Sequence, residues 1–462
     1  MWSVIARNVF RLHERLLGRQ TFARLGHLQR SQWWTRSQIE AIQLWRLQAM
    51  VAGAYDHSVY WRKRMDDLRI SPQDTRSLDD IRRFPLMVKD DIRLHREDMV
   101  WKKEGPRIRL TRTSGSTNDG LDFYTSSNRE SYVSAARMRG HQWVGVHPGD
   151  VEVYFWGAPV ELTAHDRLKQ VRDWLTNTPL TYSIALTPEM IPKYVATWAR
   201  WRAKCIFSYV CSLALFARMA RRQGVDLAVL RRRGLKALVT TAEMLTPADR
   251  SFISEAFGVP VYDSYGVREA GLIGHECSHF TMHTNDELIL LETVDPHTLE
   301  PTQGEGELVV TNLCSHVMPI IRYRTRDIVT LSNEPCACGR SLRSIRVTGG
   351  RMHEFIVTRD GRWISCVAFL YVCKAIHGVD ELQARQDTLG EVRVLVVPGR
   401  DFPRDGAKRV AEAVRQRLGN GGDRVLVELV ESIPRAPSGK QRPVISKVAE
   451  DMIARNQFAV SR

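Results

Sequence analysis

Residues 110–120 read LTRTSGSTNDG and begin at the end of a strand-like run, IRL. The small and hydroxyl-bearing residues of this stretch are Thr113, Ser114, Gly115, Ser116 and Thr117. Such a loop can wrap the oxygens of a polyphosphate, because its hydroxyls and backbone N–H groups converge on negative charge. No Gly-Lys-Ser/Thr follows at the spacing of a P-loop. The stretch therefore predicts a phosphate-binding loop of another kind, and the alternative is an ordinary surface loop.

Short apolar runs alternate with helical segments on the C-terminal side of this loop. The runs are VEVYF at 151–155, CIFSY at 205–209, ALVTTA at 237–242 and VPVYDSYG at 259–266. Helices are expected at 188–203, 211–223 and 246–256, the last opened by Thr246 as N-cap and Pro247 as first residue. This alternation predicts α/β layers around a largely parallel sheet.

The C-terminal third of the chain has a different pattern. Residues 287–331 form closely spaced strand-like runs, which indicate an antiparallel unit, and a small α+β module follows the glycine pair 349–350. We therefore predict an α/β protein of two domains. The large domain spans 1–348 and includes a basic helical segment over 1–70, and the small domain spans 349–462.

A second polar motif is VYDSYGVREAG at residues 261–271. The ring of Tyr265, beside Gly266, can stack on a nucleotide base. The carboxylate of Glu269 can hold Mg²⁺ against phosphate oxygens. The alternative for this motif is a strand end with a surface glutamate.

Three later residues have side chains suited to a nucleotide. Asp327 lies between apolar strand residues and can accept both hydroxyls of a ribose. Arg351 follows two glycines and can pair with a phosphate from a flexible joint. Lys440, in the loop IPRAPSGKQR, is one of only 12 lysines. Its compact ammonium can reach a carboxylate and a phosphate together.

The order and spacing of these motifs resemble the adenylate-forming (ANL) superfamily of acyl-CoA synthetases. Within it, the chain is most similar to the phenylacetate–CoA ligase-like branch, particularly to members associated with capsule and polysaccharide biosynthesis. The resemblance covers most of the chain. It implies a large N-terminal adenylate-forming domain of layered sheets and helices, with a small mobile C-terminal lid domain.

The resemblance also implies a reaction and a role for each motif. The implied nucleotide- and acyl-binding residues are Thr113, Ser114, Gly115, Ser116, Thr117, Ala242, Glu243, Tyr265, Gly266, Asp327 and Arg351. Glu269 would hold Mg²⁺, and Lys440 would be the catalytic lysine of the lid. The implied reaction activates a small carboxylic acid with ATP to an acyl-adenylate and transfers the acyl group to the thiol of CoA.

Three positions depart from the family's pattern. Asn118 stands where a glycine usually follows the TSGST loop, and Arg326 replaces the glycine before Asp327. The hinge carboxylate falls on His353. Because the other polar residues of the motifs are present, we expect an active enzyme. Two alternatives stay open, transfer to an amine or carrier-protein thiol, and a non-catalytic relative at a membrane-bound polysaccharide assembly site.

A separate group of residues predicts a structural Zn²⁺ site. Cys277 and His283 lie in HECSHFTMH, and Cys336 and Cys338 lie in CACG. Four such ligands in two close pairs suit a tetrahedral ion that ties two loops together, and some relatives resemble this arrangement. The rival ligands are the neighbouring histidines His275 and His279. The alternative is two unrelated sets of reduced thiols.

The chain has 462 residues with 67 basic and 52 acidic side chains, a net charge of +15. No recognisable nucleic-acid-binding module accompanies this charge, so we expect no nucleic-acid partner. No apolar run is long enough for a membrane span, which excludes an integral membrane protein. Eight cysteines make no disulfide framework, and arginines interrupt the segment a secretory signal would need, so we expect a cytoplasmic protein.

The positive charge is concentrated near the N-terminus, where residues 1–112 carry 23 basic and 13 acidic side chains. Arginines recur every four residues at positions 7, 11, 15 and 19, among apolar residues on other faces. This pattern predicts a basic amphipathic helix. Two interpretations stay open, contact with an anionic membrane surface and docking on the protein's own domain. Residues 37–67 are expected to form one long helical stretch.

Overall fold

The computed structural model describes residues 2–101, 108–112, 121–156, 172–183, 189–349, 355–361, 363–365, 376, 378–419, 422–434 and 442–455. The chain divides into two units. The first comprises Met1–Glu292, Val309–Thr325 and Leu331–Arg346, and the second Thr293–Leu308, Arg326–Thr330 and Val347–Arg462. Two segments before residue 348 thus group with the second unit, and the domain boundary after residue 348 stays a prediction.

The N-terminal region is helical. Its elements are α1 (Trp2–Leu16), α2 (Thr21–Ser31), α3 (Arg36–His57), α4 (Val59–Asp67), η1 (Pro72–Asp74), η2 (Asp79–Arg83) and α5 (Lys89–Met99). The expected single helix over 37–67 is wrong, because Ser58 is extended and separates α3 from α4. The Ser58 hydroxyl accepts a hydrogen bond from the backbone N–H of Trp61, and this cap begins α4. Over the described residues, none of the helices combines the length and apolarity needed to cross a bilayer.

One large sheet runs through the middle of the chain. Its strands are β3 (Glu152–Trp156), β4 (Leu180–Tyr182), β5 (Cys205–Tyr209), β6 (Ala237–Thr241), β7 (Val261–Val267), β8 (Gly271–Glu276), β9 (Met282–Thr284), β10 (Ile289–Val294), β11 (Glu305–Asn312), β12 (Tyr323–Ser332) and β13 (Ser344–Gly349). Their order is β10-β11-β12-β13-β9-β8-β7-β6-β5-β3-β4. The strands β3 to β7 pair in parallel, and β7, β8 and β9 pair antiparallel. The predicted α/β class is confirmed.

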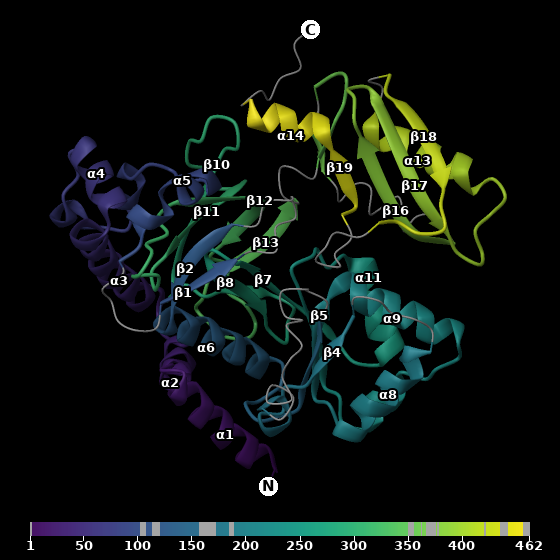
Figure 1. Cartoon of the computed structure of the whole chain (residues 1–462), viewed down its shortest axis with the longest axis horizontal. Helices are drawn as coiled ribbons and strands as arrows, with labels where there is room; N and C mark the ends of the chain where they lie inside the picture. The colour runs from purple at the N-terminus through teal and green to yellow at the C-terminus, as the bar shows by residue number, and fades with distance from the viewer. Residues whose placement is uncertain are drawn as a thin grey trace. The chain divides into compact units, whose positions relative to one another are not determined.

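Helices cover this sheet because its strands are apolar on both faces. They are α6 (Ser127–Trp143), α8 (Met190–Trp201), α9 (Val210–Arg222), α10 (Ala228–Arg232) and α11 (Pro247–Phe257). Along β5, Ile206 packs into a core with α8, α9 and α11, which lie together in Figure 1. Its neighbour Phe207 packs into a second core with Val144 and Val146, as the alternation of a strand requires.

Helix α11 begins as the Thr246-Pro247 pair predicts. The buried Thr246 hydroxyl accepts a hydrogen bond of 3.2 Å from the backbone N–H of Asp249, and Pro247 occupies the first turn. We expect Thr246→Ala to lower the free energy of unfolding of this unit by about 1 kcal/mol, because one backbone donor loses its acceptor. Urea titration followed by circular dichroism measures the loss. An unchanged midpoint would contradict the role of the cap.

The second unit contains a smaller sheet of order β18-β17-β16-β19. Its described elements are β14 (Phe355–Val357), β15 (Trp363–Ser365), β16 (Val379–Gln386), β17 (Glu391–Pro398), α13 (Gly406–Leu418), β18 (Arg424–Leu429), β19 (Val444–Ser446) and α14 (Lys447–Ala454). Alternate residues of β17, Val392, Val394 and Val396, pack against Val410 and Val414 of α13. One face of the sheet therefore forms the core of an α+β module.

Candidate functional site

Part of the predicted nucleotide site lies outside the described residues. This holds for residues 113–118 of the phosphate-binding loop, for Arg351 and His353, and for Lys440. The described flanks of the loop are β1 (Ile108–Arg112) and β2 (Asp122–Ser126), which pair antiparallel with Arg112 opposite Asp122. The roles of these predicted residues therefore stay predictions.

The structure brings two other predicted segments together at the carboxyl ends of β6 and β7. Thr241 and Ser264 are partners across these parallel strands, so the residues that follow them, Ala242 and Tyr265, are neighbours at one edge of the sheet. In open α/β sheets this edge is where ligands bind. Ala242 has a φ of 68°, a left-handed conformation that is costly for a residue with a side chain and is common at functional sites.

The glycine of the second motif is required by its surroundings. The pairing of β7 with β8 shifts in register between Tyr265 and Gly266. A Cβ on Gly266 would lie 2.8 Å from the carbonyl oxygen of Gly271, which is too close for any side chain. Irregularities of this kind are over-represented beside active sites, where they change the direction of a side chain. The half-buried Tyr265 is the side chain at this point.

Glu269 lies in the turn between β7 and β8, and its side chain is buried. The Tyr323 hydroxyl donates to its Oε1 at 3.4 Å. Arg129 of α6 donates from Nη2 to the carbonyl oxygens of Arg268, at 2.6 Å, and Glu269, at 3.0 Å. Burial lowers the pKa of Arg129, and the carboxylates of Glu130 and Glu269 oppose that shift. A carboxylate held in this way is a suitable oxygen ligand for a hard cation such as Mg²⁺.

Arg129 and Tyr323 are parts of this site that the sequence motifs do not predict. Arg129 is 140 residues from Glu269 along the chain, and Tyr323 is 54 residues from it. Neither belongs to a motif, so one sequence contains no signal for these contacts. Both are positioning residues. Arg129 holds the backbone of the turn, and Tyr323 holds the Glu269 carboxylate.

Asp327 is buried on β12, directly after a strained residue. Arg326 has a φ of 66°, in the left-handed region that favours glycine. This conformation gives a physical reason for the glycine that the resemblance leads one to expect at this position. The Arg326 guanidinium lies 3.7 Å from the carboxylate of Glu307, which is fully buried. The ion pair stabilises an arginine whose backbone conformation is unfavourable.

The four predicted zinc ligands also come together, within the first unit. The ligand atoms of Cys277, His283, Cys336 and Cys338 all lie within 4.8 Å of one another. The sulfurs of Cys277 and Cys336 are 3.8 Å apart, and His283 Nε2 is 3.1 Å from the sulfur of Cys338. Three thiolates and one imidazole in such a cluster fit a closed tetrahedral Zn²⁺ site.

The surroundings of His283 agree with a ligand role. Its Nδ1 lies 3.1 Å from the carbonyl oxygen of Leu342, so this nitrogen donates and the lone pair of Nε2 faces Cys338. Backbone N–H groups of His279 and Cys338 lie 3.4 and 3.5 Å from the sulfurs of Cys277 and Cys336, where they stabilise thiolates.

The rival ligands are not in the cluster. Nδ1 of His275 is hydrogen-bonded to the carbonyl oxygen of Glu276, and its ring packs on His141 and Trp143. His279 contributes its backbone N–H, and its side chain is exposed.

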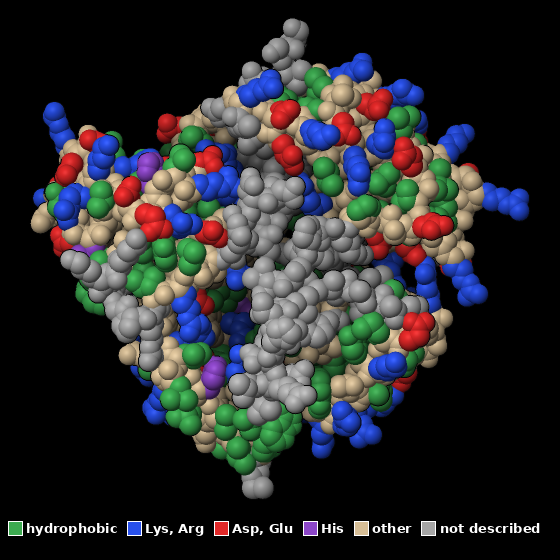
Figure 2. All heavy atoms as spheres, in the orientation of Figure 1, with side chains coloured by type: hydrophobic (Ala, Val, Ile, Leu, Met, Phe, Trp, Pro, Cys, Tyr) green, Lys and Arg blue, Asp and Glu red, His purple; other side chains and the backbone are tan. Residues whose placement is uncertain are grey.

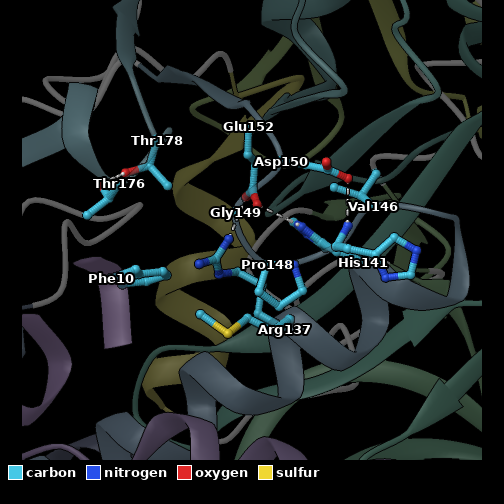
Figure 3. Close-up of a pocket in the computed structure, with 12 residues that line it drawn as sticks. Phe10, Arg137, His141, Val146, Pro148, Gly149, Asp150, Glu152, Thr176 and Thr178 are labelled. Carbon is cyan, nitrogen blue, oxygen red and sulfur yellow. Dashed lines mark hydrogen bonds and ion pairs between the residues drawn. The ribbon is translucent and has the colours of Figure 1, made fainter. Parts of the chain in front are cut away.

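A separate cavity lies at the opposite edge of the sheet, where β3 begins (Figure 3). Glu152, the first residue of β3, pairs there with Arg137 at 2.5 Å and with His141 at 3.2 Å. Burial raises the pKa of Glu152, but the charges of Arg137 and His141 and the hydrogen bonds of His141 and Tyr154 together outweigh burial and lower the pKa to about 2. The cavity lies at the amino ends of the parallel strands, away from Ala242 and Tyr265, and the Glu152 carboxylate in it is paired with Arg137.

Comparisons with known proteins agree with this fold. The model of the CapK C-terminal domain matches residues 356–447. The phenylacetate–coenzyme A ligase of Thermus thermophilus is 26% identical over 442 residues, which cover 89% of this chain and 97% of that protein. Protein CapK of Staphylococcus aureus is 25% identical and covers 80% of each chain.

Among solved structures, a 2-hydroxyisobutyryl-CoA ligase in the postadenylation state, in complex with R3-HIB-AMP, superposes with a TM-score of 0.73. It is 21% identical, and the match covers 92% of each chain. An ATP-bound MatB from Rhodopseudomonas palustris superposes with a TM-score of 0.53 at 14% identity, over 75% of this chain and 68% of that chain. The CapK domain, the curated relatives and the fold together show that the chain is an adenylate-forming, phenylacetate–CoA ligase-like protein, and an acyl-CoA ligase-like enzyme.

Proposed function

We propose that this enzyme activates a small carboxylic acid with ATP to an acyl-adenylate and then transfers the acyl group to the thiol of coenzyme A. The observation that carries the proposal is the buried Glu269 carboxylate, one turn after Tyr265 and Gly266 on the ligand-binding edge of the sheet. The relatives named as coenzyme A ligases support the same reaction. A structure of the similar 2-hydroxyisobutyryl-CoA ligase contains 2-HIB-AMP together with CoA.

Charge governs the first half-reaction. A carboxylate that attacks the α-phosphorus of ATP approaches a group of like charge, so catalysis consists mainly of alignment and electrostatic stabilisation. In this proposal Lys440 holds the acid carboxylate in line, and the loop 113–117 binds the phosphates of the leaving pyrophosphate. Glu269 would hold Mg²⁺, which supplies positive charge at those phosphates when bound. Tyr265 would stack on the adenine, and Asp327 would accept the ribose hydroxyls.

The second half-reaction requires the lysine to leave the acyl-adenylate. We propose a large domain over 1–348 and a lid over 349–462 that rotates about the glycines 349 and 350, so that a thiol replaces Lys440. The acyl-adenylate is a mixed anhydride with a good leaving group, and the thiol attacks its carbonyl carbon with release of AMP. The proposed structural Zn²⁺ would take no part in either half-reaction, because the ion would only join loops of the first unit.

We expect Glu269→Gln to reduce acid-dependent pyrophosphate exchange by about a hundredfold at millimolar Mg²⁺, because an amide is a weaker ligand than a carboxylate. Part of the loss should return as the Mg²⁺ concentration rises. The exchange of labelled pyrophosphate into ATP, measured over a panel of aliphatic and aromatic acids, tests both the proposal and the variant. Tyr323→Phe is the matched control, since it leaves the carboxylate in place and should cost less than about tenfold.

The same assay separates the remaining alternatives. Exchange without thioester formation from CoA would favour an amine or a carrier-protein thiol as the acceptor. Failure of every acid in the panel to support exchange, with a folded protein, would overturn the catalytic proposal and favour a non-catalytic polysaccharide-biosynthesis relative.

A further inference from the structure

We infer that α1 and the adjoining Trp174 form a docking surface for an anionic lipid bilayer. The inference is independent of the ligase reaction, since it rests on the side chains that α1 leaves exposed. It concerns the surface of the first unit near the N-terminus, at the bottom of Figure 1.

One face of α1, which contains Ala6, Phe10 and Glu14, docks on the protein. Ala6 is fully buried, and the buried Glu14 carboxylate accepts hydrogen bonds from the Thr21 hydroxyl and, at 3.2 Å, from Arg19. The Phe10 ring packs edge-on against Phe22. These residues recur every four positions, so they define one face of the helix.

The first turn of α1 is anchored at two further points. The indole N–H of Trp2 donates to Asn177 at 3.0 Å. The backbone of Ser3 approaches Gly149 so closely that a Cβ there would lie 2.1 Å from the Ser3 carbonyl oxygen. The orientation of α1 is therefore set by specific contacts, and these contacts leave Ile5, Leu12 and Leu16 exposed.

The apolar residues of α1 form an exposed stripe. Trp2, Ile5, Leu12 and Leu16 are 42%, 43%, 59% and 72% exposed, and Val9 between them is half-buried. Their spacing of three and four residues places them on one side of the helix. Docking on the protein's own domain, the other interpretation of the sequence pattern, thus occurs through the face of Ala6, Phe10 and Glu14, and the exposed stripe lies outside that contact.

Trp174 extends this stripe from a distant part of the chain. Its side chain is 60% exposed, and its ring centroid is 5.1 Å from that of Trp2. Figure 2 shows a continuous hydrophobic patch at the bottom of the molecule, beside the N-terminus. Tryptophan favours the interface between water and lipid headgroups, because its ring is apolar and its N–H is polar.

The charge of α1 selects the partner. Arg7, Arg11 and Arg15 are exposed on one side of the apolar stripe, while Arg19 lies beyond the helix and pairs with Glu14. Glu14 is the only acidic residue of α1 and is buried, so the exposed charge of the helix is entirely positive. A basic row beside an apolar stripe with tryptophan is complementary to an anionic bilayer surface.

A second copy of the chain fits this face less well. Two-fold pairing through α1 would bring the two rows of arginines toward each other, and α1 presents no exposed carboxylate to neutralise them. An anionic lipid surface supplies that neutralisation without any further protein group.

Vesicle flotation of the full-length protein tests the inference. We expect binding to phosphatidylcholine vesicles with about one third phosphatidylglycerol, little binding to phosphatidylcholine alone, and release at high salt. R11Q/R15Q should weaken binding about thirtyfold, because each arginine near the surface contributes about 1 kcal/mol. L12S/L16S should weaken it at least about tenfold through lost burial of apolar surface.

K408Q/R417Q is the matched charge control, since it removes two exposed basic side chains from α13 and should bind as the parent does. Leu94→Ser is the apolar control, because Leu94 is 77% exposed on another helix. Equal binding to neutral and anionic vesicles, or no effect of either α1 variant, would overturn the inference. So would an oligomer in solution that L12S/L16S dissociates, since a second copy would then occupy the surface.

Discussion

Lys440→Ala is expected to abolish acid-dependent pyrophosphate exchange while the thiolysis of a supplied acyl-adenylate by coenzyme A continues. The exchange should fall by at least about a hundredfold, the usual effect of removing a group that stabilises charge at the reacting centre. The physical reason is that only the first half-reaction brings a carboxylate against a polyphosphate. The second half-reaction joins a neutral carbonyl carbon and a thiol, and has no need of that ammonium.

Lys447→Ala is the control for this experiment. Lys447 lies seven residues later, at the start of α14, where its exposed ammonium is 2.8 Å from the carboxylate of Asp387. Its removal changes the charge of the same unit by the same amount and should leave both half-reactions intact. Equal loss of exchange and thiolysis in Lys440→Ala would contradict the assignment of separate roles to the two steps.

The parallel part of the large sheet could be predicted because its signals are local. Apolar runs of about five residues alternate with helical segments, and the helix after β6 has its own start signal at Thr246 and Pro247. The break at Ser58 was missed, although serine is a common N-cap, because the apolar pattern continues on both sides of it. A cap without a glycine or proline beside it is a weak signal.

The candidate site was predictable only where it consists of motifs. Glu269 and Tyr265 belong to one short motif, and the structure places Ala242 beside Tyr265 because β6 and β7 are neighbours. The contacts of Arg129 and Tyr323 depend on packing between distant elements, for which the sequence has no periodicity to analyse. The same limit explains why the docked face of α1 could not be identified beforehand.

In the predicted zinc cluster, geometry separates candidate ligands that spacing leaves equivalent. His275 and His283 are opposite each other on β8 and β9, and both rings contact Trp143. His283 directs Nε2 at Cys338 because its Nδ1 is held by Leu342, whereas His275 uses Nδ1 on the neighbouring carbonyl oxygen. Spacing alone could not make this distinction.

We propose that the first unit contains one structural Zn²⁺ per chain. Among the effects of a single substitution in this cluster, we expect loss of the ion to lower the free energy of unfolding the most. Cys338→Ser should eliminate the zinc from purified protein and lower the free energy of unfolding by about 5 kcal/mol or more. The melting temperature should fall by roughly 10 °C or more. Elemental analysis and thermal melting, with and without a chelator, measure both effects.

The expected loss of unfolding free energy is large because of where the cluster lies. Cys277, Cys336 and Cys338 pack with Ile39 of α3, Trp143 of α6 and Leu342. The ion would therefore join the loops after β8 and β12 at a point where α3 and α6 pack against them. Without it, partly buried thiols would remain in that core with only weak hydrogen bonds. His279→Gln is the matched control, because this exposed residue lies two positions after Cys277, and the variant should keep its zinc.

Should Cys338→Ser fail to fold, the parent protein still decides the question. Replacement of the metal by Co²⁺ should produce the visible absorption of a tetrahedral site and the near-ultraviolet charge-transfer bands of thiolate ligands. His283→Gln should retain the thiolate bands with a shifted visible spectrum, since the cluster offers one imidazole beside three sulfurs. Purified parent protein without zinc, and without a thiolate spectrum after addition of Co²⁺, would refute the site.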